Sequence, residues 1–335
     1  MSFFVVDDDR CLNYNYKRTE CHNCRNICPQ QCWDESGQIW PERCDGCGLC
    51  QSVCPVDAIG VAGMLPAAWT DLIADPADTV HLFCRQQGTG PWPCLGFLNA
   101  RDLVALALAR PNQPTREIII YSAACSQCKP VVAQHLATEL ALANDFLTRY
   151  GNPRLRVGSQ PPPPAEETRL LSRRSFFCSL LETGAATIRN VIWAEENPAP
   201  LPKAQERAKV LRGLGNLASD DLSQTVFSVV GIDGDCLACS VCAKVCPTGS
   251  LTATDHEQRM ELRHNPLLCT GCGLCTVHCP TACLALAAAG PAREHTLRVQ
   301  EFPLCNECGK SFKPAGQQLT CFDCLLKGRQ SIFGP

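Results

Sequence analysis

The cysteines between positions 236 and 283 follow a strict spacing that limits what this chain can fold into. Both halves of the stretch carry the pattern C-x2-C-x2-C-x3-C-P. The eight cysteines are Cys236, Cys239, Cys242, Cys246, Cys269, Cys272, Cys275 and Cys279. A [4Fe–4S] cube needs three close thiolates and a fourth from elsewhere, and in this motif the fourth cysteine of each run ligates the other cube. The stretch therefore predicts two cubes in one small fold.

The crossing of the fourth cysteines divides the eight thiols into two sets. We define site C as Cys246, Cys269, Cys272 and Cys275, and site D as Cys236, Cys239, Cys242 and Cys279. Gly271 and Gly273 let the backbone bend tightly around a cluster, and a proline after each fourth cysteine turns the chain away from it. Zinc is the alternative metal, but zinc sites close with two pairs of ligands, which does not suit two triples that each need a distant fourth.

The same pattern occurs again in residues 11–59, with one departure. The second run is complete and predicts a cube, site B, on Cys28, Cys44, Cys47 and Cys50. The first run has Arg18 where a cysteine is expected. We expect the remaining cube, site A, on Cys11, Cys21, Cys24 and Cys54. Cys32 competes with Cys11 for the fourth position, and a three-ligand [3Fe–4S] cluster is a further alternative. The duplication predicts four [4Fe–4S] clusters.

The composition limits where the protein works and what it binds. The chain has 335 residues and 27 cysteines, and their C-x2-C grouping favours metal ligation in a reducing compartment over disulfides. The N-terminus is acidic where a secretory signal is basic, and no apolar stretch approaches the roughly 18 residues of a membrane span. With 30 basic and 33 acidic residues, the net charge of −3 supplies no global field for nucleic acid. We expect a cytoplasmic protein with no membrane span and no nucleic-acid partner.

A segment of different character lies between the two cysteine-rich modules. Residues 78–84 and 116–125 have the composition of short buried strands, and residues 98–110 and 130–151 have the pattern of helices. Asn99 is the expected N-cap of the first helix. The order strand, helix, strand, helix predicts a small α/β unit with a parallel pair. Its cysteines fall at strand ends and in one loop, where such units collect ligands, and they are Cys84, Cys94, Cys125 and Cys128.

This central segment resembles the small iron–sulfur subunit that links hydrogenase to heterodisulfide reductase. The likeness lies in a strand-terminal cysteine, a CLG turn and a later cysteine pair. It implies a [2Fe–2S] cluster on these four cysteines, with zinc or plain reduced thiols as the alternatives. A redox disulfide between Cys125 and Cys128 is a further alternative that we rank lower.

The sequence predicts a connecting region after the central unit. The proline run at 161–164 indicates a stiff domain boundary, and a helix is expected at about 165–195. Residues 172–177, SRRSFF, look like a twin-arginine export signal, but such a signal is N-terminal and precedes an apolar core, so we interpret them as a basic helix turn. Residues 196–224 favour a connector that lies on the surface.

Four more cysteines near the C-terminus form the pattern C-x2-C-x12-C-x2-C, and they are Cys305, Cys308, Cys321 and Cys324. Two such pairs close a tetrahedral zinc site, so we predict structural zinc, with another iron–sulfur cluster as the alternative. Cys32, Cys178 and Cys283 have no assigned partner. We expect them to be small buried hydrophobic residues.

Residues 11–59 and 236–283 together resemble bacterial polyferredoxin-type electron-transfer subunits. The resemblance implies a one-electron relay to or from a catalytic protein partner, such as a molybdenum or tungsten enzyme of the formate dehydrogenase kind. The chain has no Walker loop, no G-x-G-x-x-G after a strand and no G-x-S-x-G, so we expect a non-catalytic component. A reductase that uses the central cysteines, and a redox-responsive assembly or maturation factor for a metalloenzyme, are the alternatives.

The patterns combine into a multidomain α+β fold. Two ferredoxin-like dicluster modules flank a small α/β unit, and a zinc-ribbon-like knuckle follows. The expected parts are a first module at 1–63, the central unit at 64–160, a linker and connector at 161–225, a second module at 226–290 and a four-cysteine tail at 291–335.

Overall fold

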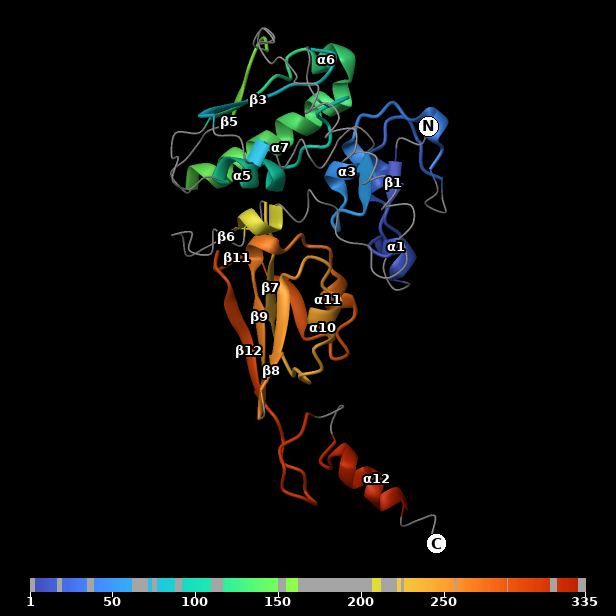
Figure 1. The fold of residues 1–335 in the computed structure, drawn as a ribbon, viewed down its shortest axis with the longest axis vertical. Coiled ribbons are helices and arrows are strands. Elements are labelled where there is room, and N and C mark those ends of the chain that lie inside the picture. The colour runs from blue at the N-terminus through green and yellow to red at the C-terminus, as the bar shows by residue number, and fades with distance from the viewer. Residues whose placement is uncertain are drawn as a thin grey trace, which may run out of the picture.

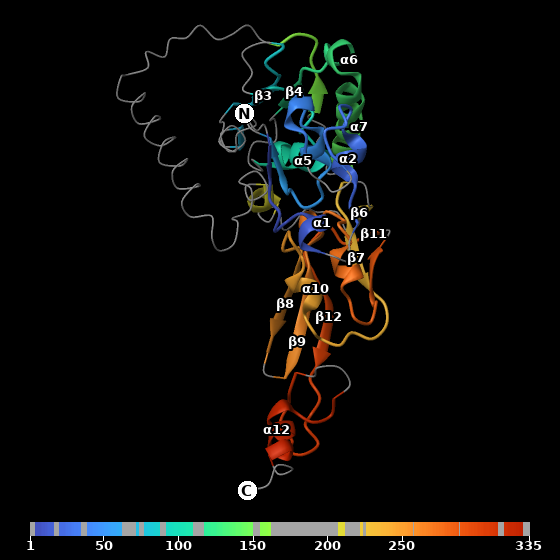
Figure 2. The same cartoon turned by 90° about the vertical axis from the view of Figure 1, so that its right-hand side faces the viewer.

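The structure is a computed structural model that describes most of the chain. The described residues are 4–16, 20–34, 39–61, 72–73, 77–87, 92–109, 117–149, 155–161, 207–211, 222–223, 226–256, 258–287, 289–313 and 318–330. The molecule is elongated, with the first cysteine-rich module and the central unit at one end and the tail at the other (Figures 1 and 2). The second cysteine-rich module lies between these ends. The predicted helix at 165–195, the residues SRRSFF and Cys178 lie outside the described residues.

The first module is closed by a pair of short strands. Strand β1 (Phe4–Val6) pairs antiparallel with β2 (Ile59–Val61), so that Phe4 pairs with Val61 and Val6 with Ile59, 57 and 53 positions apart in the sequence. The segments between them are α1 (Leu12–Asn15), α2 (Asn23–Ile27), the 3-10 helix η1 (Pro41–Arg43) and α3 (Leu49–Val53). The strand pair therefore holds the two ends of the module together around its cysteines.

The central unit is a three-stranded parallel sheet with helices packed beside it. Its strands are β3 (Thr79–Leu82), β4 (Glu117–Ile120) and β5 (Leu155–Val157), in the order β3-β4-β5. Its helices are α5 (Ala100–Leu108), α6 (Cys125–Cys128) and α7 (Pro130–Arg149). The predicted strands, helices and parallel pair are present, and Asn99 caps α5 by accepting a hydrogen bond from the Asp102 N–H at 2.9 Å. Strand β5 was not predicted, because three residues with one buried position carry little pattern.

The second module contains three small sheets. Its elements are β6 (Leu222–Ser223), β7 (Val229–Ile232), α10 (Val241–Lys244), β8 (Leu251–Asp255), β9 (Arg259–His264), the 3-10 helix η2 (Pro266–Leu268), α11 (Leu274–Val277), β10 (Leu284–Ala287), β11 (Ala289–Gly290) and β12 (His295–Glu301). Strand β7 pairs with β10, β6 pairs with β11, and the third sheet has the order β12-β9-β8. All of these pairs are antiparallel. The hairpin of β8 and β9 separates the two cysteine runs, and β12 extends its sheet from within the predicted tail.

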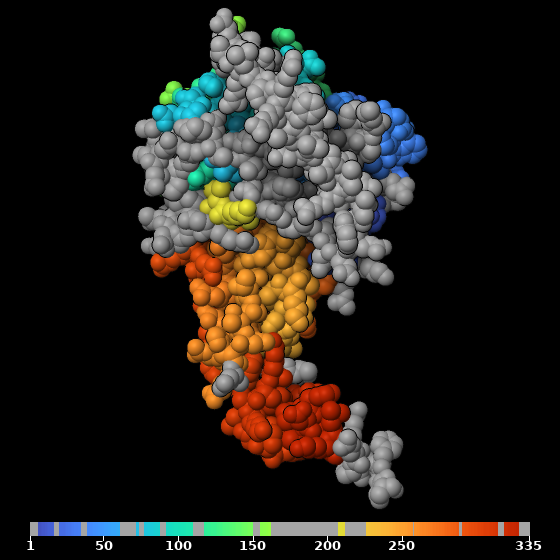
Figure 3. Space-filling model, in the orientation of Figure 1, coloured from blue at the N-terminus to red at the C-terminus, as the bar shows by residue number. Residues whose placement is uncertain are grey.

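The rest of the tail forms a separate lobe. It contains α12 (Phe322–Gln330), and Figure 3 shows it below the second module. Of the described side chains from 303 onward, only Cys305 and Cys324 are buried, whereas Phe322 is 71% exposed. The part of the lobe that the structure describes thus has no apolar core of its own. None of the described helices is long and apolar enough to cross a membrane.

The prediction of a surface connector at 196–224 is wrong at residues 207–211. These residues are helical, and Arg207 and Leu211 are 5% and 2% exposed. Arg207 donates a hydrogen bond at 2.7 Å to Asp102 on α5, and it also forms an ion pair with Asp57. A buried guanidinium requires such carboxylate partners, and the two that bind Arg207 come from distant positions in the chain. The segment therefore joins the first module to the central unit.

Candidate functional site

The same backbone turn follows the fourth cysteine of every run. The four turns are Cys28–Cys32, Cys54–Ala58, Cys246–Ser250 and Cys279–Cys283, and we call them the Cys-Pro turns. In each turn the N–H of the fourth residue donates to the carbonyl of the cysteine, at 3.2 to 3.4 Å. That fourth residue has a positive φ in all four, and it is Gln31, Asp57, Gly249 or Ala282. The turn brings the fifth residue back to the cysteine, and the Ala58 N–H donates to Cys54 Sγ at 3.2 Å.

Left-handed residues also flank the middle cysteine of three runs. Gly271 and Gly273 have φ of +69° and +76°, as the predicted tight wrap requires. Ala238 and Ser240 occupy the same positions in the run of site D, with φ of 52° and 59°. Non-glycine residues adopt this conformation at a cost, so the rest of the run holds it in place. The first run of the chain, at Cys21, lacks this pattern among its described residues.

The four cysteines predicted for site A line one cavity, together with apolar side chains such as Val6 and Ile59. The cavity contains the sulfur-bearing side chains of Cys11, Cys21, Cys24 and Cys54. The Asn13 side chain ties this loop together, because its amide donates to the Cys21 carbonyl at 2.5 Å and accepts from the Cys21 N–H at 2.8 Å. Cys11 precedes α1 and lines the same cavity as the other three cysteines. Arg18 itself lies outside the described residues.

Cys32, the competitor for site A, lies beside site B instead. Its N–H donates to Cys28 Sγ at 3.4 Å, and its thiol is within hydrogen-bonding reach of the sulfurs of Cys28 and Cys44. The other site B cysteines are close as well, since Cys28, Cys44 and Cys47 all contribute to the raised pKa of the Cys50 thiol, which is mainly due to burial. Cys11 thus lies with the other cysteines predicted for site A, whereas Cys32 lies beside Cys28 and Cys44.

The second module also groups its cysteines as the crossing rule expects. One cavity is lined by Cys236, Cys239, Cys242 and Cys279, the cysteines of site D, and by Cys283. At site C the cysteines Cys269, Cys272 and Cys246 all contribute to the raised pKa of the Cys275 thiol, which is mainly due to burial. In both sites a cysteine from one run therefore lies among three cysteines of the other.

The burial of these thiols tests whether a cluster suits the sites. Burial is the main cause that raises the pKa of Cys24, Cys242 and Cys275 to about 12, and neighbouring cysteines contribute to this shift. A thiol must lose its proton to become a ligand, and a buried thiolate needs positive charge beside it. The irons of a cluster supply that charge, and binding releases the protons. Grouped, buried thiols in sets of four therefore fit [4Fe–4S] clusters.

Neighbouring sites within each module are in electrostatic contact. In the first module, Cys24 of site A contributes to the raised pKa of Cys50 in site B, which is mainly due to burial. In the second module, Cys242 of site D contributes in the same way to Cys275 of site C. Sites A and B are thus adjacent, and so are sites C and D.

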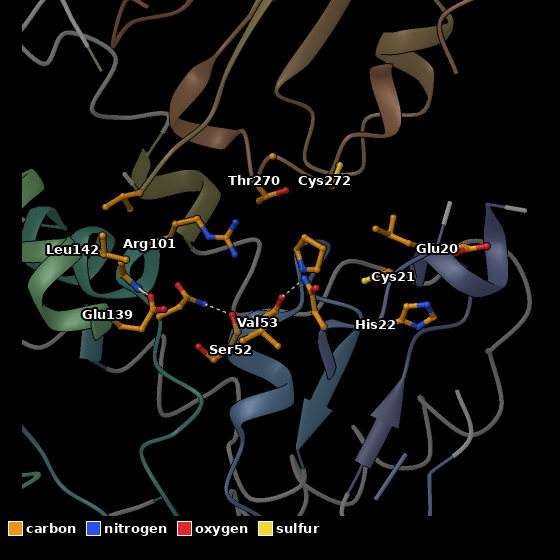
Figure 4. A pocket seen from close by; sticks show the side chains of 17 residues that line it. Glu20, Cys21, His22, Ser52, Val53, Arg101, Glu139, Leu142, Thr270 and Cys272 are labelled. Atoms are coloured by element: carbon orange, nitrogen blue, oxygen red, sulfur yellow. Dashed lines mark hydrogen bonds between the residues drawn. The ribbon is translucent and has the colours of Figure 1, made fainter. Parts of the chain in front are cut away.

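Sites A and C face each other across the boundary between the modules. Figure 4 shows a cavity of about 460 Å³ that is lined by Cys21 from site A and by Cys272 from site C. Tyr16 crosses this boundary: its ring meets the His278 ring edge to face, with centroids 5.7 Å apart. Burial raises the pKa of Tyr16, and Cys272 and Cys246 add to the shift. Figures 1 and 2 both show α1 next to the second module.

The central cysteines lie on the other side of site B. Burial raises the pKa of Cys125 to about 11, and Cys94, Cys84 and Cys128 contribute, so the four thiols are neighbours. Cys94 also contributes to the raised pKa of Cys47 in site B, which is mainly due to burial. The loops are in close contact, because a Cβ at Gly96 would lie 2.4 Å from the Cys47 carbonyl oxygen. Lys129 of the central unit also forms an ion pair with Asp45 of the first module, at 2.9 Å.

The four tail cysteines form a tighter group. The sulfurs of Cys305, Cys308, Cys321 and Cys324 all lie within 4.8 Å of one another. The sulfurs of Cys308 and Cys321 are 3.7 Å apart. Zinc–thiolate bonds of about 2.3 Å imply a tetrahedral edge of about 3.8 Å, so this spacing suits a single ion. The Cys321 N–H lowers the pKa of Cys305 to about 6, which favours a thiolate ligand at neutral pH.

Comparison with known proteins finds family matches in both cysteine-rich modules. Residues 38–60 match the model of the 4Fe-4S binding domain, and residues 235–283 match that of the 4Fe-4S dicluster domain. These matches define the class of the chain: it is an iron–sulfur protein that binds [4Fe–4S] clusters and transfers electrons. The prediction of iron–sulfur chemistry is thereby confirmed.

Three relatives narrow the class further. The 7Fe ferredoxin of Hydrogenibacillus schlegelii is 35% identical over 63 residues, which are 18% of this chain and 81% of that protein. The chain therefore belongs to the ferredoxin family. The pyruvate synthase subunit PorD of Methanothermobacter marburgensis is 39% identical over 54 residues, or 16% of this chain and 58% of that subunit. A ferredoxin of Saccharopolyspora erythraea is 41% identical over 49 residues, or 14% of this chain and 46% of that protein. The chain thus spans about half the length of two of these relatives.

Proposed function

We propose that this chain is an electron relay with four [4Fe–4S] clusters, held at sites A to D. The single observation that carries the proposal is that Cys21 of site A and Cys272 of site C line the same cavity. With the adjacency of the sites inside each module, this shared cavity supports the order B, A, C, D. Electrons then pass singly between neighbouring clusters along the long axis of the molecule.

Two features at the ends of the relay suit contact with partners. The central cysteines adjoin site B, and we propose that they hold a further metal centre, either a [2Fe–2S] cluster or zinc. At the other end, we propose one zinc ion on the tail cysteines. Zinc carries no electrons in proteins, so the tail stiffens or docks this end rather than extending the relay.

The partner that we propose is a larger oxidoreductase in the cytoplasm. A molybdenum or tungsten enzyme of the formate dehydrogenase kind is the partner that the polyferredoxin resemblance favours. A relative named as a subunit of pyruvate synthase supports a place for such a chain within an enzyme complex. The electrostatic influence of Cys94 on Cys47 favours one other function, a reductase in which the central cysteines are the end of the relay and carry out chemistry. In that case Cys125→Ser abolishes turnover and leaves every [4Fe–4S] signal in place.

Metal and sulfide analysis of anaerobically purified protein tests the cluster count. With four cubes and one zinc we expect about 16 iron and one zinc per chain, because each cube takes four cysteines and four iron. Roughly 18 iron indicates a [2Fe–2S] cluster on the central cysteines. About 12 iron or fewer contradicts the proposal, because one of the predicted sites is then empty or incomplete.

The contact between the modules is tested by EPR of the fully reduced protein. Reduced cubes that lie side by side broaden each other's signals, so site C should be coupled to both site A and site D. In Cys24→Ala, site A is lost, and we expect about four fewer iron and a narrower site C signal. The matched control is Cys239→Ala, which removes site D and leaves the coupling of A and C. A site C signal that is unchanged by Cys24→Ala contradicts the continuous relay.

A further inference from the structure

We propose that a second cavity at the boundary between the modules binds a small organic phosphate, that is, a phosphate group on a compact apolar body. The cavity has a volume of about 410 Å³, which lies in the size range of small-molecule sites. We call it the basic cavity after the side chains of Arg10, Arg101, Arg207 and Lys209 in its wall. It shares Arg101 and Thr270 with the cavity of Figure 4 but is otherwise formed by different residues.

The charges on the wall distinguish the two cavities. Among the described residues that line the basic cavity, Asp57 is the one carboxylate, and it is already paired with Arg207. The cavity of Figure 4 has the opposite balance, because Glu20 and Glu139 face it together with Arg101. A cleft lined mainly by one sign of charge concentrates ligands of the other sign. The basic cavity is therefore the one of the two that favours an anion.

Arg101 is the cation in this wall that lacks a partner. Arg207 is held by two carboxylates, and Arg10 has a carboxylate oxygen of Asp7 at 3.6 Å from its Nε. Arg101 forms neither a hydrogen bond nor an ion pair with any residue that the structure describes. Burial is the main cause that lowers the pKa of its guanidinium, Arg207 adds to this shift, and nearby carboxylates offset only part of it. A bound anion supplies the missing counter-charge.

The donors available to that anion indicate a phosphate group. Arg101 offers its guanidinium, and Arg10 Nη1 is buried without a hydrogen-bond partner among the described residues. Arginine binds phosphate through paired, charge-assisted hydrogen bonds, and one arginine is enough to occupy both oxygens of a carboxylate. A phosphate monoester has a third free oxygen and up to two negative charges. It therefore matches two arginines better than a carboxylate does.

The rest of the wall is apolar. Its apolar side chains are Val56, Leu211, Pro247, Leu267 and Leu268. Small-molecule sites commonly combine a mainly apolar lining with a few polar groups that fix the orientation of the ligand. Inorganic phosphate has no carbon skeleton to place against these side chains, and it is much smaller than the cavity. The ligand is therefore an organic phosphate rather than the bare ion.

The basic cavity lies between the Cys-Pro turns of sites A and C. Val56 and Asp57 belong to the turn that begins at Cys54, a predicted ligand of site A, and residues 247–249 belong to the turn that begins at Cys246, a predicted ligand of site C. Negative charge bound here opposes the arrival of an electron at either cluster. The ligand therefore lowers the reduction potentials of sites A and C, and this consequence rests on the proposed function, whereas the binding site does not.

Calorimetric titration of the whole, anaerobically purified chain with phenyl phosphate tests the site. We expect one phenyl phosphate to bind per chain. Inorganic phosphate, which lacks the apolar body, and benzoate, which lacks the phosphate, should both bind more weakly. Equal affinity for inorganic phosphate or for benzoate overturns the assigned ligand class, and the absence of phenyl phosphate binding overturns the site itself.

Arg101→Met distinguishes a ligand-binding arginine from a structural one. Loss of its charge-assisted hydrogen bonds should weaken phenyl phosphate binding by roughly 10- to 100-fold. The iron content and the denaturant midpoint should stay those of the unmodified protein, because the change breaks no ion pair with a described residue. Arg101→Lys keeps the charge without the bidentate geometry and should bind with intermediate affinity.

Arg149→Met is the matched control, because it removes an arginine that is 45% exposed and lies outside the cavity wall. It should keep the affinity of the unmodified protein. An Arg101→Met protein that binds phenyl phosphate as tightly as this control overturns the proposal, and so does one whose denaturant midpoint falls, since the arginine is then structural.

Redox titration followed by EPR, with and without phenyl phosphate, measures the effect on the relay. We expect the ligand to lower the potentials of sites A and C in the unmodified protein and to leave them unchanged in Arg101→Met. The two proposals fail separately. A chain with fewer than about 16 iron that still binds phenyl phosphate contradicts the relay and supports the site, whereas a chain with about 16 iron that does not bind it does the reverse.

Discussion

Replacing Arg207 by methionine is expected to lower the free energy of unfolding by about 3 to 5 kcal/mol, because the change leaves two carboxylates buried without their shared cation. Asp102 is 0% exposed and Asp57 is 8% exposed. Burial alone lowers the pKa of an arginine, but these two carboxylates raise the pKa of Arg207 above its ordinary value. The guanidinium is therefore held as the charged partner of both.

The loss should appear first at site A. Asp57 is the left-handed fourth residue of the Cys-Pro turn that begins at Cys54, so Arg207 supports the backbone of a predicted ligand. We expect a lower denaturant midpoint and an earlier loss of the visible absorbance of the clusters. Lys209→Met changes an exposed residue in the same helical stretch and should shift the free energy by no more than about 0.5 kcal/mol. An Arg207→Met protein with the midpoint of the Lys209→Met control contradicts the prediction.

Removal of zinc from the tail is expected to unfold that lobe and leave the iron in place. Apparent binding free energies of structural zinc are about 10 to 16 kcal/mol, and in small zinc sites this energy is the folding energy. The described part of the lobe buries few large apolar side chains, since Leu304, Leu319 and Phe322 are 64%, 60% and 71% exposed. We therefore expect α12 to lose its protection when the metal is removed.

Hydrogen exchange and limited proteolysis of the whole chain measure this effect. A chelator, or Cys308→Ser, should make residues 318–330 exchange and be cleaved rapidly, while the iron content stays constant. Glu307→Gln is the matched control beside Cys308, and it should keep both the zinc and the protection. If the lobe remains protected after its zinc has been removed, the metal does not hold the fold.

The prediction of cofactor chemistry needed only local spacing. Three cysteines at intervals of three residues, followed by a Cys-Pro pair, limit the chain to turns that present converging thiols, and this is why the iron–sulfur class was evident from residues 236–279. The helices and the first two strands of the central unit were also evident, because their apolar periodicity extends over enough residues. Strand β5 was too short for such a signal.

The partners of Cys11 and Cys32 required the folded chain. Both cysteines lie outside the regular spacing, so each was a candidate for the same vertex. The two hydrogen bonds between the Asn13 side chain and the Cys21 backbone hold the segment of Cys11 beside site A, and the Cys-Pro turn places Cys32 beside site B. That turn is also the signal that was missed, because a cysteine four residues after a Cys-Pro cysteine occurs in both modules.

Thus the sequence by itself determined the class of cofactor and the turns that receive it, since both depend on residues within a few positions of one another. Only the tertiary structure decided that sites A and C meet across the module boundary, that Tyr16 contacts His278 there, and that Arg207 joins Asp57 to Asp102. These contacts join residues more than 100 positions apart, and they follow from burial and charge pairing in the assembled fold, which no local pattern encodes.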